Sequence, residues 1–565
     1  MSKYTKCYIE EIDLSDVPSF EQELTKVEQF KIQSRKDLED WLRLYSELND
    51  QIRECLDGHY IDFSCQSDNP QAKEAIAWDQ EKIEPLIKRY EAKCDAKFLS
   101  SPYRRELDQD YYSQYLKSKE TAQALFREQN IDLEVEEDRL ATKYFELTGS
   151  LTADWDGEEL TISQLRNHLK NPSESTRKKA MTLMMKSIMT VSDDLQSIMD
   201  DLVRLRHKKG ENAGFSNFRD FTFHKYERFD YTPEDCSTLG RSVQKHVRPL
   251  KDACYEELRK DLGKDTLKIW DIEAVPEGIE PLKPYDTRDE LVKKTGQILG
   301  NLDPRFSKLL EKMDKQGMLD LESRKGKAPG GFCCPLPVSG LSFIFMNEAG
   351  SQDDVVTLLH EMGHCIHNDL KRDLPLSLYR DTPSESSELA SMTMELFTMD
   401  QWDVFYPDEK DLKRAKKEQF TRILDLLTFC LAVDQFQHWM YENPDHTAEE
   451  RNDKFEQLSK ELALGSIDWS GQEEWHRHRW LFILHIFEVP FYFIEYAIAQ
   501  LGALQLYQQF KKDRNEALSN YKKALKLGRS VSLPQVYEAA GIRFDFSEAT
   551  VRELALLVKQ ELDSL

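Results

Sequence analysis

The sequence predicts a mainly α-helical protein with one small β-sheet. Apolar residues recur at three- and four-residue spacings, Glu, Lys, Leu and Ala are abundant, and alternating strand patterns are few. Hydrophobic residues make up 40% and charged residues 32% of the 565 residues, which is the balance of a chain that buries a large core. A prior of roughly 100 to 200 residues per domain predicts two to four lobes.

Helical periodicity covers most of the chain and sets the predicted lobes. It is broken at the turn signals Ser67-Asp68-Asn69-Pro70 and Asn443-Pro444. The part up to about residue 160 contains no cluster of catalytic residue types, so residues 1–160 are predicted to form an N-terminal helical lobe and residues 161–565 a catalytic region. The predicted helical stretches are residues 18–60, 80–97, 108–146, 160–210 and 410–465.

The best strand candidate follows a glycine-rich turn at residues 326–331. Residues Phe332 to Asn347 contain a run of Val, Leu, Ile and Phe typical of strands. We therefore expect a short sheet directly before the motif at residue 360.

Composition excludes several classes of function. The chain has 77 basic and 103 acidic residues, a net charge of -26, and no basic stripe, so a nucleic-acid partner is not expected. Ten cysteines occur without a CxxC pair, which predicts reduced thiols. The N-terminal residues Met1-Ser2-Lys3-Tyr4 lack the basic start of a secretory signal, so a cytoplasmic location is expected.

One segment, Trp480 to Leu506, is long and apolar enough to raise the question of a membrane span. His485, Glu488, Pro490 and Glu495 interrupt it, and ionisable groups facing lipid are costly. We expect a buried helix and no membrane partner.

The chemistry is predicted at His360-Glu361-Met362-Gly363-His364, an H-E-x-x-H motif after an apolar run. On a helix, residues four apart share a face, so both histidines can bind one metal ion. Glu361 is offset by about 100°, near enough to reach a water on that metal. Two histidines on a wet helix face are the alternative, but the apolar lead-in places them in a packed interior, where a metal satisfies both. The pattern indicates a zinc hydrolase with Glu361 as general base.

A catalytic zinc site needs a third protein ligand, and residues 381–395 offer three glutamates. The pattern predicts a helix start with Thr382 as N-cap, Pro383 at N1 and Glu385 as the capping-box glutamate. The side chain of Glu385 would then be used in the cap. Glu388 is then the better third ligand, and Glu385 remains the alternative. Glu395 either orients a ligand histidine or is a solvated or salt-bridged helix residue.

These motifs resemble the oligoendopeptidase F and thimet oligopeptidase family of zinc metallopeptidases, in which H-E-x-G-H is followed by a helix carrying E-x-x-S-x-x-x-E. Here residues 360–364 match the first element and residues 388–395 match the second. The resemblance implies that His360, His364 and Glu388 hold one zinc ion and that Glu361 is the catalytic base and acid.

A further match runs from His485 to Ala497, similar to the family's histidine followed by a tyrosine-bearing helix. In that family these groups contact the substrate and the tetrahedral oxyanion, so the resemblance implies these roles for His485, Tyr492 and Tyr496. A buried aromatic stripe at this spacing is the alternative. His367 also follows the family pattern, and either a role in orienting a ligand or a packing role is expected for it in place of ligation, because three ligand positions are already filled.

The resemblance implies a two-lobed helical body around a deep substrate channel, with the zinc at its floor and Phe332 to Asn347 as the edge strand that binds the peptide backbone. The predicted function is a zinc-dependent oligoendopeptidase that cleaves internal bonds of short peptides. The alternatives are a zinc carboxypeptidase or dipeptidyl carboxypeptidase, a catalytically silent peptide-binding protein, and a structural zinc protein. The sequence does not predict the oligomeric state.

Overall fold

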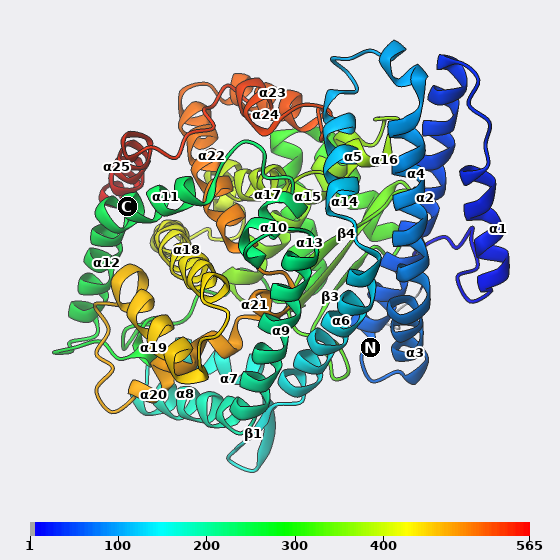
Figure 1. Ribbon diagram of the computed structural model, residues 1–565. Helices are drawn as coiled ribbons and strands as arrows, with labels where there is room; N and C mark the ends of the chain where they lie inside the picture. Colours follow the sequence, from blue (N-terminus) through cyan, green and yellow to red (C-terminus); the bar gives the residue numbers. More distant parts are fainter. Residues whose placement is uncertain (1–5) are drawn as a thin grey trace.

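The computed structural model describes residues 6–565, and the fold is mainly helical with two small sheets (Figure 1). The predicted fold class is therefore confirmed. Residues Met1–Tyr4, which entered the prediction of location, lie outside the described residues.

The N-terminal helices stand along one side of the molecule (Figure 1). The stretch predicted as one helix over residues 18–60 is two helices, because the chain leaves helical geometry at residues 29–34 and Ser34 caps the second helix by accepting a hydrogen bond from the Asp37 amide. The elements are α1 (Val17–Glu28), α2 (Arg35–Cys65), α3 (Pro70–Trp78), α4 (Glu84–Ser100), α5 (Ser113–Leu125) and α6 (Glu128–Gly149).

A two-stranded hairpin, β1 (Thr152–Trp155) and β2 (Glu158–Thr161), follows and was not predicted. Asp156 and Gly157 form its turn with φ of 56° and 92°, the positive values that a tight hairpin turn requires. The helices after it are α7 (Ile162–Asn167), α8 (Glu174–Met189), α9 (Ser192–Asn212), α10 (Phe218–Lys225), α11 (Pro233–His246), α12 (Arg248–Asp261), α13 (Arg288–Leu302) and α14 (Pro304–Lys315).

The predicted sheet before the motif is present. It contains β3 (Leu319–Glu322), β4 (Phe332–Leu336) and β5 (Leu341–Glu348) in the order β3-β5-β4. The central strand β5 pairs parallel with β3 and antiparallel with β4, and its residues are almost all buried. β4 is thus an edge strand.

The C-terminal part is helical throughout. Its elements are α15 (Gln352–Lys371), α16 (Ser377–Arg380), α17 (Ser384–Thr398), α18 (Glu409–Glu442), α19 (Ala448–Leu458), α20 (Glu473–His478), α21 (Leu484–Glu488), α22 (Phe493–Lys512), α23 (Arg514–Leu525), α24 (Leu533–Ala539) and α25 (Glu548–Ser564).

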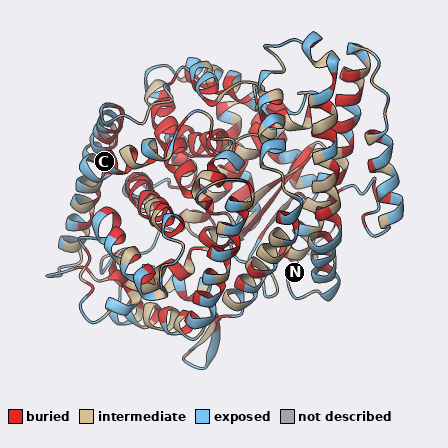
Figure 2. Cartoon of the chain, in the orientation of Figure 1, coloured by how far each residue is buried: buried red, intermediate tan, exposed pale blue. Residues whose placement is uncertain are grey.

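The buried residues form two cores. A small core joins residues from Ile12 to Tyr115 with Leu376 and Tyr379, whereas a large core takes in α6 and nearly all elements after it. Helices α15, α17 and α22 lie at the centre of the large core, and their ribbons are mostly buried in Figure 2.

The apolar segment from Trp480 to Leu506 lies in this large core as α21 and α22, in agreement with the expected buried helix. Within residues 6–565, no helix combines the length and apolar character needed to cross a membrane. None of the ten cysteines, which all lie within residues 6–565, forms a disulfide.

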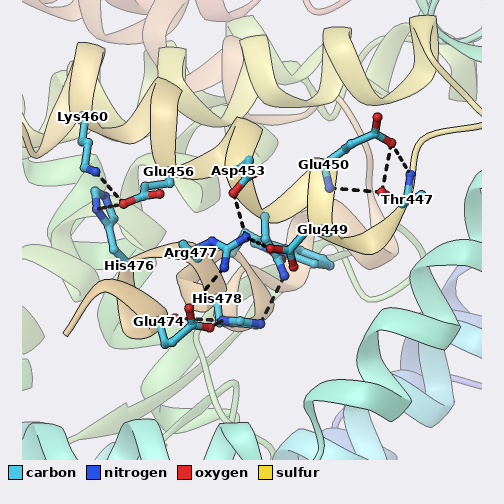
Figure 3. A network of polar contacts seen from close by, with 12 residues as sticks. Thr447, Glu449, Glu450, Asp453, Glu456, Lys460, Glu474, His476, Arg477 and His478 are labelled. Atoms are coloured by element: carbon cyan, nitrogen blue, oxygen red, sulfur yellow. Dashed lines mark hydrogen bonds and ion pairs between the residues drawn. The ribbon is translucent and has the colours of Figure 1, made fainter. Parts of the chain in front are cut away.

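The short helix α20 begins the segment that leads to α21, and surface ion pairs hold it in place. Arg477 of α20 contacts Glu449 and Asp453 of α19 as well as Glu474 of its own helix, with 2.7 Å between Arg477 Nη2 and Asp453 Oδ1 (Figure 3). These contacts attach α20 to α19.

Candidate functional site

The site is built on α15, which carries His360 and His364. Ser351 and Asp354 form a capping box at its start, and the helix buries most of its residues in the large core. The two histidine rings lie on one face with centroids 5.0 Å apart. Their side chains keep 19% and 17% exposure, so solvent still reaches them.

A glycine lets α17 approach α15 closely enough to bring a carboxylate to the histidines. A Cβ atom on Gly363 would lie 2.5 Å from Ser391 Cα and 2.8 Å from the Ala390 carbonyl oxygen. Any side chain at residue 363 would therefore force the two backbones apart. The glycine of the motif is required by this helix packing.

The structure brings together the three predicted ligands His360, His364 and Glu388. Glu388 Oε2 lies 3.2 Å from His360 Nε2 and 3.7 Å from His364 Nε2, and the three ligand atoms are all within 4.8 Å of one another. Zinc bonds to nitrogen and oxygen of about 2.0 to 2.2 Å give neighbouring ligand atoms about 3.3 to 3.5 Å apart in a tetrahedron. Two imidazoles and a carboxylate therefore fit one zinc ion.

Glu395 lies against the first histidine. Its Oε1 accepts a hydrogen bond from His360 Nδ1 at 2.7 Å, and its Oε2 accepts one from Gln419 Nε2, also at 2.7 Å. Of the two roles left open for Glu395, the contacts are those of a group that orients a histidine. Gln419 in α18 was not identified from the sequence.

The predicted cap at the start of α17 is wrong. The helix begins at Ser384 with Pro383 as its N-cap, and the Thr382 hydroxyl instead contacts Ser387 and accepts a hydrogen bond from Lys371. Glu385 accepts a hydrogen bond from Tyr231 at 2.6 Å. The side chain of Glu385 is thus occupied, but by a tyrosine far away in the sequence.

Burial and neighbouring charges shift the pKa values of the cluster. Burial raises the pKa of Glu361 to about 7 and lowers that of His364 to about 4. Burial opposes ionisation of Glu388, but the two histidines and Tyr492 outweigh it and lower its pKa to about 2. For His360, burial is likewise outweighed by hydrogen bonds to Glu388 and Glu395, which raise its pKa above the usual value.

His485, Tyr492 and Tyr496 line the same site. The Tyr492 hydroxyl donates a hydrogen bond to Glu388 Oε1 at 2.8 Å, and the Tyr496 hydroxyl lies 3.4 Å from His485 Nε2. Burial lowers the pKa of His485 to about 4, so its ring is neutral at pH 7. His367 is buried on α15 and lies outside the ligand cluster, which agrees with a packing role.

Two buried arginines hold the backbone between His485 and Tyr492. Arg206 donates hydrogen bonds to the carbonyl oxygens of Ile486 and Phe487, and Arg228 donates one to the carbonyl oxygen of Phe491 at 2.6 Å. Phe491 has a φ of 67°, a strained value for a residue with a side chain. Neither arginine was identified from the sequence, where both look like ordinary charged residues.

Comparison with known proteins identifies relatives over most of the chain. Residues 167–556 match peptidase family M3 and residues 9–126 match the peptidase M3 N-terminal domain.

The group B oligopeptidase PepB of Streptococcus agalactiae is 24% identical over 447 residues, which are 74% of this chain and 71% of the relative. An oligoendopeptidase F homologue of Borreliella burgdorferi is 24% identical over 69% of this chain and 66% of its own length. The solved structure of PZ peptidase A with an inhibitor shares the fold, with a TM-score of 0.92 at 24% identity over 100% of this chain and 99% of that one.

Proposed function

Because this chain belongs to peptidase family M3, we propose that it is a zinc-dependent oligoendopeptidase that hydrolyses internal bonds of short peptides. The observation that carries the proposal is the convergence of His360, His364 and Glu388 beside the buried carboxyl group of Glu361. Two imidazoles and one carboxylate leave a fourth position open, as in catalytic zinc sites. The names of the relatives, an oligopeptidase and an oligoendopeptidase F homologue, support peptides as substrates.

His360, His364 and Glu388 would hold the zinc ion, which would polarise the scissile carbonyl group and the attacking water. Glu361 would accept the proton of that water and pass it to the leaving amine. A pKa near 7 suits both steps, because the same carboxyl group must take up and release a proton near neutral pH.

The two tyrosines would have different roles. The Tyr492 hydroxyl already donates a hydrogen bond to Glu388, so we assign Tyr492 to fixing that carboxylate. The Tyr496 hydroxyl and His485 Nε2 lie 3.4 Å apart, a long contact that Tyr496 would exchange for a hydrogen bond to the oxygen of the tetrahedral intermediate. We therefore place oxyanion stabilisation on Tyr496, with His485 beside it.

The peptide backbone would pair with the edge strand β4. Cys333 of β4 lies with its Sγ 3.5 Å from Sγ of Cys365, the residue after His364, so this strand runs beside the cluster. Pairing through main-chain groups binds peptides of many sequences. The limited exposure of His360 and His364 favours extended peptides over folded proteins as substrates.

The division into an N-terminal lobe of residues 1–160 and a catalytic region of residues 161–565 is part of this proposal. The small core, which joins residues from Ile12 to Tyr115 with Leu376 and Tyr379, supports a distinct N-terminal part, as does the match of residues 9–126 to the N-terminal domain of the family; α6 belongs to the large core.

The test is digestion of peptides of about ten residues, read by mass spectrometry, with the protein as isolated, after chelation, and as Glu361→Gln. Each peptide is supplied with a free and with an amidated C-terminus. We expect internal cuts in both forms, which disappear after chelation and in Glu361→Gln although that variant still binds zinc. Cuts that need a free C-terminus would favour a carboxypeptidase or dipeptidyl carboxypeptidase. If no cleavage depends on the metal, the proposal fails.

A further inference from the structure

A second cluster of ligand-type side chains lies outside the site described above. Cys236 comes from α11, and Asp434 and His438 come from α18. Their ligand atoms, a sulfur, a carboxylate oxygen and an imidazole nitrogen, all lie within 4.8 Å of one another. As in the first cluster, two ligands stand four residues apart on one helix face and the third comes from a neighbouring helix.

All three side chains are withdrawn from solvent. Cys236 is 2% exposed, Asp434 0% and His438 9%. Nevertheless, both carboxylate oxygens of Asp434 and Nε2 of His438 have no hydrogen-bond partner among the described residues. Leaving buried polar atoms unpaired is costly, most of all for a carboxylate, so the arrangement requires an explanation.

A direct ion pair between Asp434 and His438 explains only part of this arrangement. Their Oδ2 and Nε2 atoms are 3.2 Å apart but are not aligned as a hydrogen bond, and Oδ1 would stay unpaired. The nearby cation Arg228 does not pair with Asp434: its Nη2 bonds to the Phe491 carbonyl oxygen and to Glu495 Oε1 at 2.6 Å, and its Nε and Nη1 have no hydrogen-bond partner among the described residues.

We propose that Cys236, Asp434 and His438 form a second metal site that takes one zinc ion with a structural role. A thiolate, an imidazole and a carboxylate are all zinc ligands, and the sulfur favours zinc over magnesium or calcium. The separation of 3.2 Å between Oδ2 and Nε2 is close to the about 3.3 Å expected between neighbouring ligand atoms of a tetrahedral zinc site. Because both oxygens of Asp434 are unpaired, bidentate binding would bring the donor atoms to four.

The position of the cluster gives the ion a structural consequence. It joins α11 to α18, and the His438 ring packs on Phe491 with centroids 5.4 Å apart. The Phe491 amide also donates a hydrogen bond to Gln437, the residue before His438. Phe491 directly precedes Tyr492. A metal at this site would therefore fix the position of Phe491, where the segment that carries Tyr492 and Tyr496 begins. The inference goes beyond the proposed function, which needs only the first zinc ion.

The first test is metal content and spectrum after chelation and reconstitution with Co²⁺. We expect two ions per chain in the unaltered protein and one in Cys236→Ala. We also expect a near-ultraviolet band from sulfur-to-cobalt charge transfer, which the first site cannot give because it has no sulfur ligand. Cys236→Ala should abolish this band. Cys94→Ala, a matched change of a buried cysteine in the small core, should keep the band and both ions.

Two further measurements show whether the second cluster binds zinc independently of the first. Zinc X-ray absorption on the unaltered protein should show sulfur scattering at about 2.3 Å, and this needs no variant. Glu388→Gln, which disrupts the first site, should lose peptide cleavage but keep the sulfur band. Loss of peptide cleavage thus reports on the first site, and loss of the sulfur band reports on the second. One ion per chain without sulfur scattering, or a band that persists in Cys236→Ala, would overturn the proposal.

Discussion

Replacing Gly363 by alanine tests whether the close approach of α15 and α17 sets the metal site. The added Cβ would lie 2.5 Å from Ser391 Cα, whereas ordinary contacts are 3.4 to 4 Å. Ser391 Cα and the Ala390 carbonyl oxygen, which would lie 2.8 Å away, both belong to the backbone of α17, so no flexible side chain can move aside. The helices must separate locally by about 1 Å, and overpacking of this kind costs about 1 to 3 kcal/mol of folding free energy.

The same displacement moves the ligands apart. His360 and His364 stand on α15, while Glu388 stands on α17. Zinc sites hold their ligand distances to within about 0.2 Å, and changes in the groups that merely orient ligands already cost about 10- to 100-fold in affinity. We therefore expect Gly363→Ala to weaken zinc binding by at least about tenfold, and peptide cleavage to fall with it at low zinc.

Gly296→Ala is the matched control. Gly296 lies within α13, and its Cβ would meet only Leu310 Cδ2 at 3.8 Å. Alanine should stabilise that helix by about 0.5 to 1 kcal/mol relative to glycine. Denaturant unfolding of the metal-free proteins measures the change in folding free energy that is due to packing alone. Competition with a coloured chelator measures zinc affinity separately. Unchanged zinc affinity and stability in Gly363→Ala would refute the reasoning.

Three further predictions concern the first cluster. Glu395→Gln should weaken zinc binding about 10- to 100-fold, measured by chelator competition, because His360 loses its carboxylate partner. Zinc affinity should fall as the pH drops through the pKa of His360, which Glu388 and Glu395 raise well above the ordinary histidine value, because a proton then competes with the metal. Calorimetry in buffers of different ionisation enthalpy should detect the released proton, and a pH-independent affinity would contradict this. Tyr496→Phe should lower kcat about 10²- to 10³-fold with zinc retained, whereas Tyr492→Phe should also weaken zinc binding; equal zinc affinities in the two variants would count against the separate roles.

The parts of the structure that local sequence encodes were predictable. The spacing of His360 and His364 sets their common face, and the helix that follows carries Glu388 and Glu395 at the positions where both meet α15. The mainly helical fold and the sheet before the motif follow from periodicity in the same way. The cytoplasmic location stays a prediction.

The parts that depend on distant partners were not predictable. The start of α17 was misplaced because the Thr382 hydroxyl contacts Lys371 and Ser387, and no local rule indicates that competition. Tyr231 lies 154 residues before its partner Glu385. The hairpin at residues 152–161 is too short to give a clear alternating pattern. In each case the deciding contact is tertiary.

The long apolar segment shows how tertiary contacts resolve an ambiguity in the sequence. Its ionisable residues made a lipid-facing helix costly, and in the fold two of them have specific partners: Glu495 pairs with Arg228 at 2.6 Å, and His485 meets Tyr496. A buried charge without a partner is strongly destabilising, so Arg228 offsets part of the cost of burying Glu495. Since Arg228 also binds the carbonyl oxygen of Phe491, the ion pair that allows Glu495 to be buried holds the backbone directly before Tyr492 as well. Two of the four residues that argued against a membrane span, His485 and Glu495, therefore hold or line the segment beside the candidate metal site.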